Sequence, residues 1–590
     1  MPTPYTGQRF VFTNPDGSQV HVRGFGNQFA AVFETDDGFT VVKDPASGFF
    51  HYAQRSPDGT TLVPTGPRVG EIAPGALTLS THLRPAASAT RARARAAREA
   101  APVPRWAQRR AARKPRSPAP PTGAGPDSPD GDDAARSSPS PGVLGSYVGL
   151  CLLIDFPDVP GTLTRRQVTN FANKAGYRRF GNNGSVRDYF LAVSDGRLDY
   201  SNLVTAYCTA KHPRSYYTDP GVDFGRRARG LIKEGLAQSK ARGLDFTPLT
   251  VDSAGFVRAL NVFYAGELDN AWAEGLWPHS SALADPVTVA ANRSFSDYQI
   301  TNLGSELALR TFCHENGHMI CDFPDLYDYG FESYGTGDYC LMSYGASDQN
   351  PAQVCAYLKH QAGWTSTLTT LRPGMTASAT AGRNDFLRYA RSATEYFLVE
   401  NRAQTGRDEA LPDSGLAIWH VDETATNNAE AMTADEHYEC SLEQADGRFD
   451  LERQVNYGDA KDLFGAPDRR TFGASTRPDS RWWDGAQSGL DIVDIGAPGS
   501  TMTVTTAKAA KVDLGNLKFG VRNSADVVRL QIALNAHFAG LGLPTSGNYL
   551  QQTDAAVRRC QRRHGFGSDP KGKSFVGKSQ AAHLGLRTSA

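Results

Sequence analysis

The chain lacks an excess of charge of either sign, because 62 Lys and Arg residues stand against 62 Asp and Glu among its 590 residues. A general nucleic-acid-binding protein needs a basic surface, so this balance argues against that class. No run of residues is long and apolar enough to cross a bilayer, and we expect no transmembrane segment. The first residues, MPTPYTGQRFVF, contain neither the basic nor the apolar region of a secretory signal, so no signal peptide is visible.

Cysteine is scarce, and none of the eight cysteines belongs to a CxxC pair of the kind that holds structural zinc. An even number permits disulfides without requiring them, so the count leaves the redox compartment open. No cysteine precedes Cys151. The N-terminal segment therefore contributes no thiol.

A chain of this length is too long for one hydrophobic core, and its composition divides it into parts. Residues 1–84 contain two strand–turn–strand patterns, FVFTNPDGSQVHVRGFG and FAAVFETDDGFTVVKD, and we predict a β-rich domain. Residues 85–142 are mainly Ala, Arg, Pro, Ser and Asp, with Trp106 as the one aromatic residue. This composition buries too little apolar surface to offset chain entropy, so it predicts a disordered linker. The linker is either a solvated spacer or a protease-sensitive hinge that also attracts anionic wall polymers.

Ordered structure is expected again from residue 143. The stretch VLGSYVGLCLLIDFPD is typical of a buried central strand, and residues 143–370 combine helix and strand signals. Residues 371–508 contain many short strands separated by Gly, Pro and Asp, which indicates a β-sandwich. Residues 511–590 predict a small helical domain whose first helix is capped by Ser524. The fold class is therefore multidomain α+β.

The stretch TFCHENGHMICDFPDLYDYG contains two histidines four residues apart, His314 and His318. The preceding residues, SELALRTFC, favour a helix, which would place both imidazoles on one face. Their nitrogens would suit two corners of a zinc tetrahedron, and Glu315 would act as general base on a water whose pKa zinc lowers to ~7. Such a short pattern also occurs by chance. Gly317, which permits close approach to the helix, and Met342, as an apolar floor in the turn GTGDYCLMSYG, favour the metal-site interpretation.

The motif and several other stretches together resemble immune inhibitor A-type secreted zinc metallopeptidases. The stretches are GFGNQFAAVFETDDGFTVV, DFPD, GSVRDYFLAVSDGRLDY, PDLYD, PAQVCAYLKHQAGW, EYFLVENR, GLAIWHVDE and EQADGRFDL. The resemblance covers most of residues 8–506 apart from the linker. It implies a metzincin-like catalytic domain at residues 143–370, in which His314 and His318 bind zinc, Glu315 is the general base, and an aspartate is the third ligand.

The position of the third ligand departs from the family pattern. In that pattern a glycine lies three residues after the second histidine, and the ligand lies six residues after the same histidine. Here these two positions hold Cys321 and Pro324. One inserted residue makes Asp325 the third ligand, while Asp322 takes the left-handed turn of the glycine. The alternative is that Asp322 is the ligand. Asp328 is expected to cap the loop.

The resemblance also suggests how the site is completed and controlled. Some metzincins place a tyrosine where Tyr344 stands, so its phenol is a candidate stabiliser of the oxyanion, and the alternative is a core aromatic residue behind the turn. Residues 1–84 resemble the family's propeptide, and cleavage in the arginine-rich linker would activate the enzyme. Asp36 and Asp37 either block the zinc in the latent form or belong to an exposed hairpin turn.

The C-terminal stretches SADVVRLQIALNAHF, GNYLQQTDAAVRRCQRRHGF and FVGKSQAAHLGL resemble the bacterial peptidoglycan-binding three-helix module. This resemblance implies bacterial peptidoglycan as a partner and an extracellular or cell-wall-associated protein. Upstream, four aspartates in EQADGRFDLERQVNYGDAKDLF either bind calcium, which prefers oxygen ligands, or lie in solvated turns. They are Asp446, Asp450, Asp459 and Asp462.

Taken together, the sequence predicts a zinc endopeptidase that hydrolyses peptide bonds in proteins and is targeted to the bacterial cell wall. One alternative is a non-catalytic wall-binding protein whose protease domain has decayed. Another keeps the zinc chemistry but takes the peptide stems of peptidoglycan as substrate.

Overall fold

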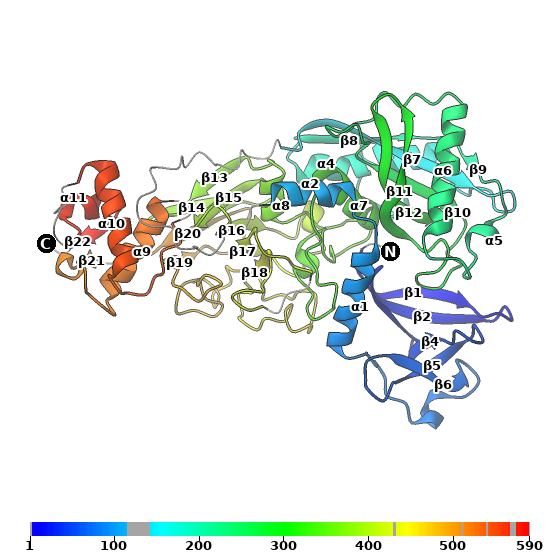
Figure 1. Ribbon diagram of the computed structural model, residues 1–590, viewed down its shortest axis with the longest axis horizontal. Helices are drawn as coiled ribbons and strands as arrows, with labels where there is room; N and C mark the ends of the chain where they lie inside the picture. The colour runs from blue at the N-terminus through cyan, green and yellow to red at the C-terminus, as the bar shows by residue number, and fades with distance from the viewer. Residues whose placement is uncertain are drawn as a thin grey trace.

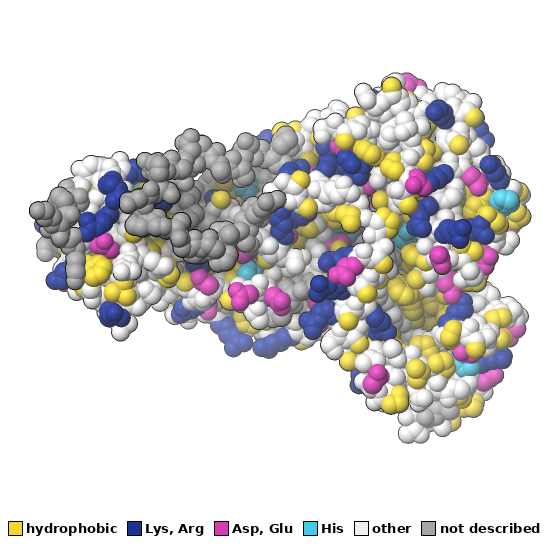
Figure 2. Space-filling view, viewed as in Figure 1, with side chains coloured by type: hydrophobic (Ala, Val, Ile, Leu, Met, Phe, Trp, Pro, Cys, Tyr) yellow, Lys and Arg dark blue, Asp and Glu magenta, His cyan; other side chains and the backbone are white. Residues whose placement is uncertain are grey.

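The computed structural model describes residues 3–114, 142–428, 432–508, 511–538, 541–566 and 574–588. Helices are combined with five separate sheets, so the mixed α+β character is confirmed. The molecule is elongated: the N-terminal sheet and the largest mixed sheet lie at one end, and the C-terminal helices form the other (Figure 1). Basic and acidic side chains are interspersed over the face seen in Figure 2, as expected without a net charge. Within the described ranges, no helix has the length and hydropathy needed to span a membrane.

The N-terminal region is a six-stranded antiparallel sheet in which each strand pairs with the next along the chain. Both predicted strand–turn–strand patterns are present, with Gly17 and Gly38 at positive φ in their turns. The sheet buries aromatic residues such as Phe10 and Phe12 against Trp277, which comes from the following domain. The strands are β1 (Tyr5–Thr13), β2 (Gln19–Gly26), β3 (Ala31–Glu34), β4 (Thr40–Lys43), β5 (Phe50–Arg55) and β6 (Leu62–Arg68).

Two helices, α1 (Ala87–Ala100) and α2 (Arg105–Arg113), occupy the first part of the segment predicted to be a disordered linker. The prediction is wrong for these residues because it counted only apolar surface. Alanine and arginine are good helix formers, and the arginines find acidic partners elsewhere in the chain, which local composition does not reveal. The second part of the predicted linker, residues 115–141, lies outside the described residues.

A second six-stranded sheet has the strand order β11-β12-β10-β7-β8, with the short β9 also paired to β7. Strands β12, β10, β7 and β8 are parallel, and β11 is an antiparallel edge strand. The stretch predicted to be a buried central strand is β7, which lies between β10 and β8. The bounds are β7 (Gly145–Asp155), β8 (Leu198–Val204), β9 (Cys208–Thr209), β10 (Leu260–Ala265), β11 (His279–Ala290) and β12 (Arg293–Leu303).

Helices cover both faces of this sheet, which explains the near-continuous apolar run in β7. Cys151 and Leu153 share a core with residues of α3, α4 and α7, whereas Leu152 and Ile154 share another with α6. Helix α7, which carries the histidine motif, therefore packs on the same face as α3 and α4. The bounds are α3 (Arg165–Asn173), α4 (Val186–Val193), α5 (Arg214–Tyr217), α6 (Arg226–Ala241), α7 (Leu309–Cys321) and α8 (Ala356–Gln361).

Residues 367–506 form two further sheets, of order β13-β15-β16-β17-β18 and β14-β20-β19. Phe397 and Ile418 of the first sheet share a core with Ile492 and Val504 of the second. Leu398 and Trp419, which alternate with those residues, belong to the same core as α7. The strands are β13 (Thr367–Thr370), β14 (Thr376–Thr380), β15 (Asp385–Ala390), β16 (Glu395–Arg402), β17 (Gly415–Asp422), β18 (Cys440–Leu442), β19 (Ile492–Ile495) and β20 (Thr501–Thr506).

The C-terminal module has three helices and its own hydrophobic core. Its elements are β21 (Lys511–Val512), α9 (Ala525–His537), α10 (Gln551–His564), α11 (Lys578–His583) and β22 (Arg587–Thr588). Ser524 caps α9 as predicted, since its hydroxyl accepts a hydrogen bond from the Val527 N–H. Strands β21 and β22 pair in parallel and bring the two ends of the module together.

The contact of Trp277 with the N-terminal sheet predicts that this residue attaches the sheet to the following domain. Trp277 is fully buried, with its ring centroid 5.3 Å from that of Phe10. Trp277→Ala should destabilise this contact by ~3–5 kcal/mol, because it leaves a cavity in an aromatic core. Amide exchange of β1 and β2 should then accelerate, whereas Val11→Ala, at a residue 41% exposed on β1, should leave it unchanged. Equal exchange in both variants would contradict the assignment.

Candidate metal centre

Helix α7 brings His314, Glu315 and His318 together in the interior. The histidines lie four residues apart, and all three side chains are almost fully buried. The helix ends at Asp322, which adopts the left-handed conformation with φ 57° and donates its N–H to the carbonyl of His318. The structure thus gives Asp322 the left-handed turn expected of it. The chain reverses there and returns toward the histidines.

Backbone carbonyls orient both imidazoles. Nδ1 of His314 lies 2.9 Å from the carbonyl oxygen of Leu341, and Nδ1 of His318 lies 2.6 Å from that of Phe323. A carbonyl oxygen only accepts, so both Nδ1 atoms carry the hydrogen. The two Nε2 atoms are 3.2 Å apart, so their lone pairs can serve one ion. This orientation by a carbonyl is typical of metal-binding histidines.

Asp325 completes the cluster. Its Oδ1 lies 2.9 Å from Nε2 of His314 and 3.3 Å from Nε2 of His318, and its Oδ2 accepts a hydrogen bond of 2.5 Å from the hydroxyl of Tyr329. Burial by itself would raise the pKa of Asp325, but the two imidazoles outweigh it and hold that pKa below its usual value. Asp322 instead directs its carboxylate to arginines. Of the two candidate third ligands, Asp325 is therefore the one beside the histidines.

Glu315 is buried without a hydrogen bond to either carboxylate oxygen. Its Oε1 is 3.9 Å from Nε2 of His314, and the side chain lines the same cavity as His318 and Asp325. Burial raises the pKa of Glu315 above its usual value, while His314 and His318 oppose the shift. A buried carboxylate without a partner is costly, so Glu315 is placed to accept a hydrogen bond from a molecule in the cavity.

Met342 lies directly beneath the helix, as expected for the floor of the site. The side chain is fully buried, and a Cβ atom added at Gly317 would stand 2.8 Å from its sulfur. A larger residue at position 317 would require the side chain of Met342 to move. The glycine in the motif thus has a packing reason that is independent of the histidines.

Two imidazole nitrogens and one carboxylate oxygen form a donor set that zinc accepts, with a position left open for a water or substrate. The unpartnered oxygens of Glu315 lie where such a water needs a base. In the metal-free state burial alone would lower the pKa of His318. Asp325 has the opposite and stronger effect, so that the pKa rises to about 9. Metal binding at this cluster would therefore displace protons. The residues present fit zinc.

The structure does not bring Tyr344 to this cluster. Its ring packs 4.5 Å from that of Tyr457 and 5.5 Å from that of Tyr334, in the position of a core aromatic residue. Sequence reasoning instead missed Tyr329, whose hydroxyl contacts Asp325 directly. Its spacing of four residues from Asp325 is the one local signal that points to it.

Helix α2 lies across the entrance to the cluster. The indole of Trp106 stacks on the imidazole of His318 with ring centroids 4.5 Å apart and an interplanar angle of 22°. Residues from the segment 98–114 and from the cluster together enclose a cavity of about 470 Å³. Sequence reasoning missed this contact, although Trp106 is the sole aromatic residue in a segment predicted to be solvated.

Acidic side chains from later parts of the chain pair with the arginines of α2. Asp322, with no exposed side-chain surface, pairs with Arg109 at 2.7 Å and also with Arg113. The backbone N–H groups of Arg105 and Trp106 donate to the carboxylate of Asp297, which caps the helix from outside. Two further pairs, Arg105–Asp252 and Arg110–Glu439, extend the contact along the helix.

The proposed zinc-blocking residues Asp36 and Asp37 lie elsewhere. Asp36 pairs with Arg23 at 2.7 Å on the exposed hairpin between β3 and β4, which is the alternative considered for this turn. Gln28 and Phe29 of the N-terminal region line the cavity beside the cluster, and Trp106 of α2 stacks on His318.

The other groups considered for metal binding or disulfides are partly brought together. Asp446, Asp450 and Asp459 offer oxygens within 4.8 Å of one another, so the calcium site stays a prediction. The carboxylate of Asp462 accepts hydrogen bonds from the N–H of Asp459 and the hydroxyl of Tyr339. All eight cysteines are buried free thiols, and no disulfide is present among the described residues.

Substitution of the two candidate third ligands separates their roles. Asp325→Ala should lose one equivalent of bound zinc relative to the unsubstituted chain, because it removes the carboxylate that lies 2.9 and 3.3 Å from the two imidazole nitrogens. Asp322→Asn should retain it, since asparagine tolerates the left-handed conformation and the carboxylate faces arginines. Metal analysis after dialysis measures both. Zinc loss in Asp322→Asn with zinc retention in Asp325→Ala would reverse the assignment.

Comparison with known proteins adds no identity to this geometry. No family model matches the chain, and a search of curated proteins also returns no match. The functional interpretation therefore depends on the buried cluster and on the sequence motifs that surround it.

Proposed function

We propose that this chain is a zinc-dependent endopeptidase of the immune inhibitor A type. The observation that supports it most is the convergence of His314, His318 and Asp325 around one point, beside the unpartnered carboxylate of Glu315. Three of these groups, Glu315, His318 and Asp325, line one cavity, and polar groups of this kind are costly to bury without partners. A decayed protease domain would be under no constraint to keep this arrangement, so the structure favours the catalytic alternative.

The residues divide the work of peptide hydrolysis. A zinc ion held by the two histidines and Asp325 would polarise the scissile carbonyl and supply a water with a pKa of ~7. An oxygen of Glu315 takes the proton of that water and returns it to the nitrogen of the leaving amine. The raised pKa of Glu315 suits the second transfer, in which the carboxyl acts as an acid. No covalent bond between enzyme and substrate is required.

The full-length chain is latent in this proposal. Trp106 covers His318, and α2 fills the space beside the cluster in which an extended substrate would bind. The arginines of α2 bind carboxylates that are buried beneath it, so the helix stays in place until the connection to residues 143–590 is cut or the helix is displaced. Cleavage in the arginine-rich linker by a trypsin-like protease is the proposed activating event.

The C-terminal module supports localisation of the enzyme at the cell wall. It folds around its own core, and its stretches resemble those of peptidoglycan-binding domains. We therefore place the active protein outside the cell, bound to bacterial peptidoglycan and acting on protein or peptide substrates. The peptide stems of peptidoglycan are the second candidate substrate, because the same module would bring them to the metal centre.

Replacing the general base tests the chemistry. In trypsin-treated protein, Glu315→Gln should lower casein hydrolysis by ~10²–10⁴-fold, the usual contribution of a positioned acid–base group, while bound zinc is unchanged. Glu306→Gln, at an exposed residue before the same helix, is the matched control. Release of stem peptides from sacculi, measured in parallel, distinguishes the two substrates. Equal turnover by both variants would refute the proposed mechanism.

Removing the arginines that hold α2 tests latency. Arg109→Ala combined with Arg113→Ala should raise casein hydrolysis by the uncut chain about tenfold or more, because losing one partner of a buried charge pair costs ~3–5 kcal/mol. Trp106→Ala should act in the same direction by uncovering His318. Arg95→Ala, at an exposed pair with Glu99 on α1, should leave the basal rate unchanged. The proposal fails if none of these chains, nor the trypsin-cut parent, exceeds the uncut parent.

A further inference from the structure

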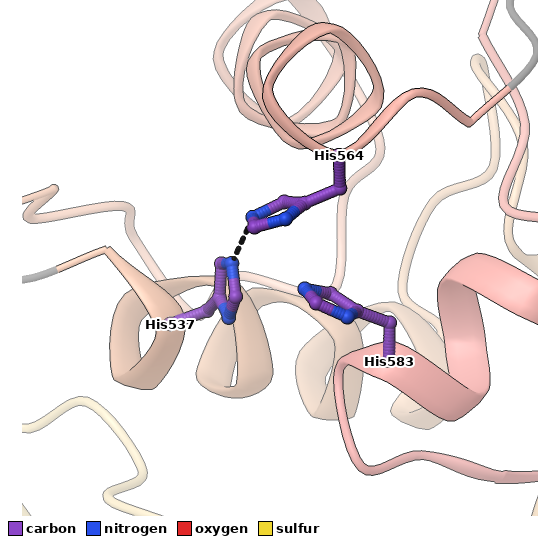
Figure 3. A group of neighbouring side chains, drawn as sticks. All are labelled: His537, His564 and His583. Carbon is purple, nitrogen blue, oxygen red and sulfur yellow. Dashed lines mark hydrogen bonds between the residues drawn. The ribbon is translucent and has the colours of Figure 1, made fainter.

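Three histidines converge in the C-terminal module, far from the zinc motif along the chain. His537 is the last residue of α9, His564 the last of α10, and His583 the last of α11. In Figure 3 the three rings extend from separate helices toward one another. Each offers a ring nitrogen within 4.8 Å of the other two, and Nε2 of His537 is 2.8 Å from Nε2 of His564.

This approach of nitrogens has a chemical consequence. A hydrogen bond between two imidazole Nε2 atoms uses one proton, so at least one of the two rings keeps a lone pair directed into the cluster. The ring centroids of His564 and His583 are 4.1 Å apart, too close for both rings to be charged without repulsion.

The helix ends add to the attraction for a cation. Helices α9 and α10 run for 13 and 14 residues, and the negative ends of their dipoles meet at this cluster. Arg559 and Arg563 lie nearby, but their guanidinium groups stack over the ring of Phe538, at 4.9 and 5.8 Å from its centroid. The same phenylalanine packs edge-on against His537 at 4.7 Å.

A single histidine at a helix end is explained by its interaction with the helix dipole. The helix dipole does not explain three histidines whose nitrogens lie this close together, because protonated imidazoles repel one another. The cluster is also accessible: His537 and His564 are half-buried, and His583 is exposed. Ligand atoms on a tetrahedral zinc lie ~3.3 Å apart, so small side-chain rotations bring all three nitrogens to one ion.

We propose that His537, His564 and His583 bind one divalent transition-metal ion of the zinc class, which ties together the ends of the three helices of the C-terminal module. Imidazole ligands select zinc, cobalt, nickel or copper over calcium and magnesium, which prefer oxygen. Three protein ligands leave one position for water or for a carboxylate from a bound partner. The site is separate from the catalytic cluster and does not depend on the proposed peptidase activity.

Cobalt binding to the full-length chain tests the site, with every protein made in a Glu315→Gln background to prevent self-digestion. The parent should bind two equivalents that give cobalt absorption bands, His564→Ala or His583→Ala one, and His318→Ala one. The double variant His318→Ala/His564→Ala should bind none. His21→Ala, at an exposed histidine of β2, is the matched control and should bind two.

Amide exchange gives a readout that does not depend on stoichiometry. At a cobalt concentration about 100 times the dissociation constant, exchange through unfolding of α9 and α10 should slow by about 100-fold in the parent and not in His564→Ala. A chain that binds one equivalent whether or not His564 and His583 are present, with no cobalt effect on α9 and α10, overturns the proposal. If that single equivalent is lost in His318→Ala, the catalytic proposal still stands.

Discussion

The end of helix α7 at Asp322 is the constraint on which the site depends. A left-handed residue at this position ends the helix one turn after His318 and reverses the chain. Asp325 therefore returns to the imidazoles of His314 and His318. The same residue presents a fully buried carboxylate to the opposite side, where arginines neutralise it. One backbone conformation thus positions the third candidate ligand and creates the anchor for the covering helix.

Ion pairs hold α2 to the rest of the chain, together with the stacking of Trp106 on His318. Arg105, Arg109 and Arg110 each meet a carboxylate that is nearly inaccessible to solvent. Removing α2 would leave those carboxylates without their main partners, which stabilises the covered state. A cover of this kind needs little apolar surface, and for that reason its composition resembles that of a solvated linker.

The two histidine clusters are built differently. At His314 and His318 each Nδ1 donates to a backbone carbonyl, so both rings are held in one tautomer with Nε2 directed inward. The histidines of the C-terminal module are held by helix ends and by packing against Phe538 and Phe566 instead. The first arrangement suits a buried catalytic ion, and the second suits a more exposed ion that joins helices.

Local patterns in the sequence determined the elements that depend on near neighbours. The hairpins of residues 5–43, the buried strand β7, the helix under His314 and His318, and the cap at Ser524 all follow from residue spacing. The left-handed turn at Asp322 also follows, because a short acidic residue replaces a glycine there. Only the tertiary structure decided which aspartate meets the histidines, that Tyr329 rather than Tyr344 contacts it, and that Trp106 covers the cluster. The contacts of α2 join residues far apart in the sequence, such as Arg109 and Asp322, which no local pattern reveals. Asp325 and Tyr329 are near the motif in the sequence, but their contacts depend on how the chain packs after its reversal at Asp322.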